Sequence, residues 1–101
     1  MTVDDAGFAV IVAAPVVVIV FSAAWCQPCA RGVIEAEAAG AAAGLPVFVA
    51  DIDLAPDAAM AARVRGVPTI SIWRDGVMAG AVLGDTPRDK LKTFFDKLKG
   101  N

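Results

Sequence analysis

Cys26 and Cys29 are the only cysteines in this chain of 101 residues, and they lie three positions apart. They follow an apolar run, VVVIVF at residues 16–21, whose β-branched composition is typical of a strand buried on both faces. On a helix that starts near Cys26, the two side chains share one face, and the distance between their Cα atoms suits a disulfide. The unpaired N–H groups of the helix start favour a thiolate at Cys26, and Cys29 lies one turn deeper. The spacing therefore predicts a redox pair in which Cys26 attacks and Cys29 resolves.

Two other uses of the cysteines must be weighed against redox chemistry. A structural zinc site takes four ligands, and a chain with two thiols and no histidine would need a second copy or two carboxylates to complete it. Two neighbouring cysteines can also serve as small apolar residues of a core. A CxxC pair between a strand and a helix favours dithiol–disulfide exchange over both, and no metal is expected.

Composition limits the remaining possibilities. A chain of this length that is 57% hydrophobic can bury one core, so a single domain over residues 1–101 is expected. The absence of histidine excludes catalytic triads and metal sites that depend on imidazole. The net charge is −2, and nucleic-acid binding is not predicted. The lysines near the C-terminus are interpreted as a solvated helix face: Lys90, Lys92, Lys97 and Lys99.

Residues 8–25 raise the question of secretion, because their apolar run ends in small residues as a signal peptide does. However, Asp4 and Asp5 precede the run without any Lys or Arg, Pro15 interrupts it, and cleavage would remove a predicted core strand. The run is also shorter than the ~20 residues that a membrane-spanning helix needs. A cytoplasmic protein without membrane association is expected, and a thiol pair in that compartment indicates redox chemistry.

The helices and strands that position the cysteines are predicted from hydrophobic periodicity and from residues that begin or end helices. Asp4 and Asp5 can cap a first helix that Pro15 ends, and Gly44 is a natural stop for the helix that begins near Cys26. A strand, a helix and a second strand of these lengths form a parallel pair with a right-handed crossover. The expected elements of this half are a helix to about residue 14, a strand at 16–21, a helix at 26–43 and a strand at 46–53.

The second half of the chain continues the pattern with a short helix at 57–65 that Gly66 ends. Asp75-Gly76 lies between two strand-like runs and predicts an antiparallel hairpin. A last helix is expected with Thr86 as its cap and Pro87 at its first position. Its core-facing stripe is Leu91, Phe94, Phe95 and Leu98. The order αβαβαββα predicts an α/β fold with a mixed four-stranded sheet between helices.

The sequence resembles the thioredoxin family in several motifs. VVVIVFSAAWCQPC at 16–29 is similar to the family's strand followed by WCxPC, and GVPT at 66–69 is similar to its proline loop. DGVMAGAVLG at 75–84 is similar to its hairpin that ends in a glycine. The resemblance covers nearly the whole chain except the family's first β-strand, which is expected to be absent because the chain starts at the first helix. It implies a thioredoxin-like fold.

The resemblance also implies a substrate-binding surface around Cys26. Pro68 is expected to be a cis-proline opposite the cysteines, and the backbone of Val67 is expected to bind an extended substrate segment. Trp25 and Gly84 would flank Cys26, although Trp25 could instead be core filler and Gly84 a plain turn residue. The full expected set is Trp25, Gln27, Pro28, Val67, Pro68 and Gly84.

Four positions depart from the family's usual residues: Gln27, Val20, Val49 and Ser22. Gln27 replaces the glycine between the cysteines and adds no charge, which favours a reducing protein, since strongly oxidising members often carry a histidine here. Val20 and Val49 match the positions of a buried Asp and its Lys partner. Ser22 stands where the family often has a bulky residue, so the site is expected to be less tightly supported.

The loss of the buried aspartate affects the resolving cysteine most. It should stabilise the fold, because buried ion pairs are often replaceable by apolar residues. It also removes the expected proton acceptor of Cys29, so resolution of a mixed disulfide should be slow near neutral pH. Asp51 or Asp53, near the end of a neighbouring parallel strand, could act as the base instead.

The most favoured function is reduction of protein disulfides by the Cys26–Cys29 dithiol, which needs no bound cofactor. The resemblance implies that electrons come from an NADPH-dependent flavoprotein reductase or a related dithiol donor, and a monomer is expected. Two alternatives remain open. One is a dithiol oxidase or isomerase in an oxidising compartment, and the other is a binding or assembly module without redox activity.

Overall fold

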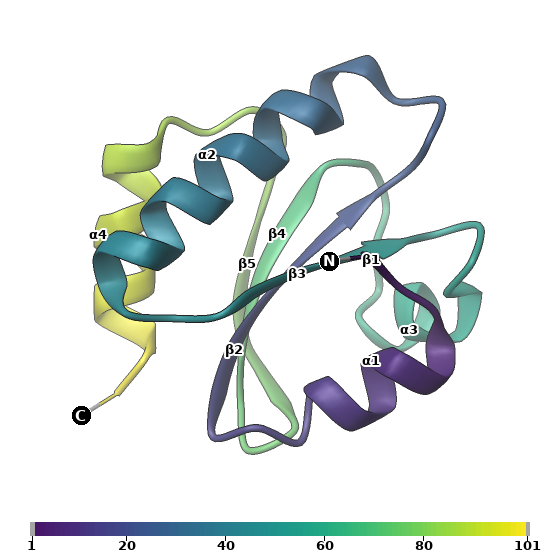
Figure 1. Cartoon of the computed structure of the whole chain (residues 1–101), viewed down its shortest axis with the longest axis horizontal. Coiled ribbons are helices and arrows are strands. Elements are labelled where there is room, and N and C mark those ends of the chain that lie inside the picture. Colours follow the sequence, from purple (N-terminus) through teal and green to yellow (C-terminus); the bar gives the residue numbers. More distant parts are fainter. Residues whose placement is uncertain (1, 101) are drawn as a thin grey trace.

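The computed structural model describes residues 2–100 and has a five-stranded mixed sheet at its centre (Figure 1). The strands lie in the order β1-β3-β2-β4-β5. Central β2 is parallel to β3 and antiparallel to β4, and β5 is antiparallel to β4. The strands are β1 (Thr2–Val3), β2 (Val16–Ser22), β3 (Val47–Asp51), β4 (Thr69–Arg74) and β5 (Val77–Leu83).

The expectation of four strands without the family's first strand is wrong. Thr2 and Val3 form β1 and pair in parallel with Val49 and Ala50 of β3. Val3 is buried and packs in the same cluster as Phe8. Two residues are too few to show a strand periodicity, and the partner that makes them a strand lies more than forty positions further along the chain. This strand is therefore invisible to pattern reasoning.

Four helices cover the two faces of the sheet, α2 and α4 on one side and α1 and α3 on the other (Figure 1). They are α1 (Asp5–Ile11), α2 (Gln27–Ala43), α3 (Pro56–Ala61) and α4 (Arg88–Leu98). Alternate residues of β2 enter the two cores: Val18 and Val20 pack with α2 and α4, and Ile19 packs with α1 and α3. Both faces of β2 are buried, as its continuous β-branched run predicts. Within residues 2–100, no helix has the length and apolar character needed to cross a membrane.

Several helix and turn signals in the sequence are confirmed. Asp4 caps α1 by accepting a hydrogen bond from the Gly7 N–H at 2.9 Å. Gly44 ends α2 with φ +74°, a left-handed conformation that glycine adopts without strain. Asp75 and Gly76 form the tight turn of the β4–β5 hairpin with φ values of +52° and +83°.

Three predicted helix limits are wrong by a few residues. The helix α1 ends at Ile11 and α3 at Ala61, both earlier than the patterns predict. After α3 the backbone leaves the helix through Arg63, whose φ is +56°. Thr86 is not the cap of α4, because Pro87 occupies that position and the Thr86 hydroxyl donates to Gly84 O at 3.4 Å.

The helices α3 and α4 have no side-chain cap of their own, and acidic residues from earlier helices take that role. Asp5 of α1 accepts the Ala58 N–H at 2.8 Å, at the start of α3. Glu35 of α2 accepts the Arg88 N–H at 3.1 Å and the Arg88 guanidinium at 2.8 Å. The guanidinium hydrogen bond is the main cause that lowers the pKa of Glu35 and raises the pKa of Arg88. These contacts tie each helix pair together on its face of the sheet.

Candidate active site

The junction between β2 and α2 positions the two cysteines. The Cys26 N–H donates to Ala23 O at 3.1 Å, which closes the turn after β2, and Cys26 then forms the N-cap of α2. Cys29 lies in the first turn, its Cα 5.4 Å from that of Cys26, and the two form a disulfide. Cys26 is half-buried, whereas Cys29 is only 1% exposed. The structure thus places the two sulfur atoms in the unequal environments that the sequence pattern predicts.

The proline loop lies opposite Cys26. The Val67–Pro68 peptide bond is cis, and the Cys26 Sγ lies 3.9 Å from Val67 O. The Gly84 N–H donates to Pro68 O at 2.8 Å, which joins the loop after β5 to the proline loop. Gly84 has φ +92°, a region that side chains rarely adopt. Three segments distant in sequence therefore meet around one sulfur atom.

Gly32 is a positioning residue that the sequence reasoning missed. A Cβ atom at this position of α2 would lie 3.0 Å from Pro68 Cγ and 3.1 Å from Pro68 Cβ. The proline ring therefore packs directly on the helix backbone, one turn beyond Cys29. The sequence signal that could have identified it is an isolated glycine within a helical pattern. Glycine destabilises a helix, so a glycine at such a position often has a packing reason.

Trp25 lies on the surface beside Cys26, with 67% of its area exposed, so it is not core filler. Its indole Nε1–H donates to Asp53 Oδ2 at 3.0 Å. The Asp53 N–H in turn donates to Asp51 Oδ1 at 2.8 Å. The two carboxylates that the sequence suggested as bases thus hold the turn after β3 and orient the indole, a role that the sequence reasoning missed.

The other residues of the expected substrate surface lie nearby but differ in accessibility. Gln27 and Pro28 are exposed at the start of α2. Val67 and Gly84 are half-buried, and Pro68 is buried. The accessible part of the site is therefore formed mainly by Trp25, Gln27 and Pro28, with the half-buried Cys26 beside them.

No ionisable group lies on the central strand beneath the cysteines. Val20 is fully buried, and its Cα is paired with Val49 on one side and Ile70 on the other. The direct pairing of Val20 with Val49 shows that these two valines occupy neighbouring positions across β2 and β3. Val20 packs among the apolar residues on the α2 and α4 side of the sheet, whereas Val49 is half-buried.

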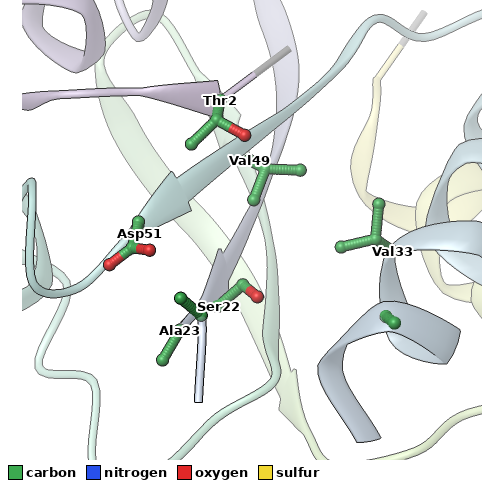
Figure 2. Close-up of a pocket in the computed structure, with 8 residues that line it drawn as sticks. Thr2, Ser22, Ala23, Val33, Val49 and Asp51 are labelled. Carbon is green, nitrogen blue, oxygen red and sulfur yellow. The ribbon is translucent and has the colours of Figure 1, made fainter. Parts of the chain in front are cut away.

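Ser22, at the end of β2, leaves an open pocket of about 410 Å³ against α2. Figure 2 shows Ser22 and Asp51 on the ends of neighbouring strands, with Val33 of α2 across the space. Ala30 and Ala23, both small, also line the pocket. Small side chains therefore form much of the wall of this pocket at the start of α2. Within residues 2–100, no three His, Cys, Asp or Glu side chains gather as a metal site would require.

Comparison with known proteins identifies the family. The model of the Thioredoxin family matches residues 1–97. A thioredoxin of Staphylococcus aureus is 32% identical over 97 residues, which cover 94% of this chain and 93% of the relative. A thioredoxin of Rhodospirillum rubrum is 38% identical over 73 residues, 70% of each chain. The structure of a mutant thioredoxin from Halobacterium salinarum NRC-1 superposes with a TM-score of 0.85 at 28% identity, over 100% of this chain and 91% of that one.

The match over almost the full length agrees with the geometry of the site. The α/β thioredoxin fold, the CxxC pair at the start of α2 and the cis-proline loop beside it occur together in one chain. The redox-active group is the Cys26–Cys29 disulfide itself. The chain therefore belongs to the thioredoxin family and is a thiol–disulfide reductant that works through the Cys26–Cys29 dithiol.

Proposed function

We propose that Cys26 is the attacking thiol and Cys29 the resolving thiol in the reduction of protein disulfides. The observation that carries this assignment is the difference in burial, because a substrate sulfur can approach half-buried Cys26 but not Cys29, which is 1% exposed. The position of Cys26 at the N-cap of α2 supports it, since the helix start favours negative charge on that sulfur.

The reaction proceeds in two exchange steps. The Cys26 thiolate attacks one sulfur of the substrate disulfide, and the other substrate sulfur leaves as a thiolate and takes up a proton. Cys29 then loses its proton and attacks the Cys26 Sγ of the mixed disulfide. The second substrate thiolate leaves, and the Cys26–Cys29 disulfide forms. The substrate gains two electrons, and the protein's two thiols supply both, so no bound cofactor is required.

The substrate-binding surface consists of Trp25, Gln27, Pro28, Val67, Pro68 and Gly84. The exposed indole of Trp25 provides an apolar contact held in place by Asp53. The carbonyl of Val67 lies beside the Cys26 sulfur, where it can accept a hydrogen bond from an extended substrate backbone. Hydrogen bonds to the substrate backbone do not depend on its side chains, so segments of many sequences can bind.

The protein acts as a cytoplasmic monomer and is reduced again by a dithiol donor, for which an NADPH-dependent flavoprotein reductase is the leading candidate. Membership of the thioredoxin family supports a reductase partner. A protein that reduces substrate disulfides should itself have a low reduction potential, about −270 mV, as thioredoxins have. A measured potential of about −120 mV, typical of strong oxidants, would contradict reduction as the direction of the reaction.

Trapping tests the roles of the cysteines. In the Cys29→Ser variant, the mixed disulfide on Cys26 cannot be resolved, so substrate proteins should remain attached until dithiothreitol is added. Cys26→Ser should capture no substrates, and the variant with both substitutions controls for attachment elsewhere. Capture by Cys26→Ser but not by Cys29→Ser would reverse the assignment.

A further inference from the structure

A groove lies beside the active site, between the segment after α3 and strand β5, and encloses about 310 Å³. Apolar side chains form much of its wall, and two arginines stand on its rim. We call it the arginine groove, and its main residues are Arg63, Val64, Arg65, Met78, Ala81 and Leu83.

The arginine groove is continuous with the cysteine site. Leu83, which lines the groove, is followed by Gly84, whose N–H is bound to Pro68 O. A Cβ on Gly66, in the proline loop, would lie 3.3 Å from Leu83 Cδ1. Thr69, directly after the cis-proline, also lines the groove. A polypeptide that passes Cys26 and Val67 can therefore continue into the groove.

The groove is positively charged on a protein whose net charge is −2. Arg63 and Arg65 are both exposed, and the residues that line the groove include no Asp or Glu. Among residues 2–100, the side-chain ion pairs engage Arg31, Arg88 and two lysines of α4, and none engages Arg63 or Arg65. Both guanidinium groups are thus available to an anionic partner.

The backbone conformation at Arg63 is unusual for a residue with a side chain. Its φ of +56° lies in the left-handed region, where glycine fits with less strain than a residue with a side chain. The chain nevertheless has an arginine there. The wall on the other side belongs to β5, the last strand of the sheet order, so one edge of that strand carries no neighbouring strand.

We propose that the arginine groove binds the extended segment of a substrate protein next to its reacting cysteine, and that it selects acidic residues in that segment. This inference rests on the proposed attack by Cys26. Apolar contacts with Val64 and Leu83 hold the segment, and Arg63 and Arg65 pair with its carboxylates. Charge pairs at a rim steer association and depend on salt, so the selection acts mainly on the rate at which substrates are captured.

Three peptides test the selection. They share one disulfide loop and differ only in two residues next to the first cysteine, which are both Glu, both Gln or both Lys. An excess of fully reduced protein is mixed with each oxidised peptide, and chromatography measures the reduced peptide with time. Reduction of the same peptides by dithiothreitol corrects for their intrinsic reactivity. An exposed ion pair contributes a factor of about 1.4 to 5, so two pairs should make the Glu peptide about two- to twenty-five-fold faster than the Gln peptide at low salt.

Variants show whether the two arginines cause the preference. In Arg63→Gln/Arg65→Gln the three peptides should react at equal rates, and in Arg63→Lys/Arg65→Lys the order should remain. Arg74→Gln, which changes an exposed arginine outside the groove, should leave the preference unchanged. High salt should reduce the wild-type preference.

The outcomes separate the groove from the proposed function. Equal rates for the three peptides in the wild type, or a preference that persists in the double Gln variant, would overturn the selection by the groove. Failure to reduce any of the peptides would overturn the attack by Cys26, and the groove proposal with it.

Discussion

A carboxylate at Val20, the position that corresponds to a buried aspartate in the resemblance to the thioredoxin family, should accelerate attack by Cys29 and destabilise the fold. Val20 is fully buried on the central strand, Cys29 is 1% exposed, and the strand neighbours of Val20 are Val49 and Ile70. No ionisable side chain is paired with this position. The substitution Val20→Asp therefore introduces a buried carboxyl group without a charged partner.

The cost in stability follows from burial. Loss of a fully buried valine side chain removes about 1.5–3 kcal/mol of apolar stabilisation, and burial of an unpaired polar group adds about 1–3 kcal/mol. Together they predict a decrease of about 2.5–6 kcal/mol in the free energy of unfolding. A small domain with about 5–15 kcal/mol of stability can remain folded after such a loss.

The gain in rate concerns the proton of Cys29. A positioned general base contributes about 10²- to 10⁴-fold at most, so an unoptimised one should accelerate resolution about tenfold to hundredfold. Burial raises the pKa of an introduced carboxyl group, so the acceleration should increase as the pH rises through neutrality and the carboxylate forms.

Stopped-flow mixing of the reduced protein with an aromatic disulfide measures the step directly. Attack by Cys26 releases one coloured thiolate, and attack by Cys29 on the mixed disulfide releases the second. The second phase should be faster in Val20→Asp than in the wild type, with the first phase unchanged. Val20→Asn is the matched control, because it has a similar shape and polarity but no basic group. Equal second-phase rates for wild type and Val20→Asp across neutral pH would refute the reasoning, as would equal acceleration in Val20→Asn.

Three further predictions concern stability. Gly40→Ala should lower the free energy of unfolding by about 1–3 kcal/mol, since its Cβ would collide with a side chain of β3, and urea denaturation would measure the loss. Ser71→Ala should cost about 1–3 kcal/mol in the same assay, because the buried Ser71 hydroxyl accepts the Trp73 indole N–H at 2.8 Å. Glu35→Gln should lower the urea midpoint near pH 7. Arg88 lowers the pKa of Glu35, so the carboxylate contributes its full stabilisation above its ordinary pKa of 4.5. The difference from wild type should disappear as the pH falls below 4.5 and through the lowered pKa of the folded protein.

Each of these predictions has a clear contrary result. Alanine normally stabilises a helix relative to glycine, so a more stable Gly40→Ala variant would show that α2 and β3 can separate at no cost. Unchanged stability in Ser71→Ala would mean that the indole finds another acceptor. Glu37→Gln, on the exposed side of the same helix, is the control for Glu35→Gln and should show no loss near pH 7. A difference for Glu35→Gln that grows in acid would contradict the assigned ion pair.

The central strand, the turn chemistry and the redox pair could be predicted because each depends on neighbouring residues. The β-branched run of β2 predicts burial on both faces, and Gly44 and Asp75-Gly76 supply the backbone conformations that their turns require. Cys26 and Cys29 are close in any helix that starts there, whatever the rest of the chain does. These features need no knowledge of the fold.

Other features depend on residues that only folding brings together. The two residues of β1 become a strand through β3, and Asp5 and Glu35 cap helices whose own sequences lack a capping side chain. The Trp25–Asp53 hydrogen bond and the packing of Pro68 against Gly32 likewise join segments far apart in the chain. A single sequence carries no local signal for such pairs.

The sequence by itself therefore determined the chemistry, a dithiol at the start of a helix after a buried strand, because that chemistry needs only a spacing and a local backbone conformation. The tertiary structure decided what surrounds the dithiol. It orients the indole beside Cys26, buries Val20 and Cys29, and places Arg63 and Arg65 on a groove that continues from the site. Those arrangements arise from packing between distant segments, and packing is set by the whole chain at once.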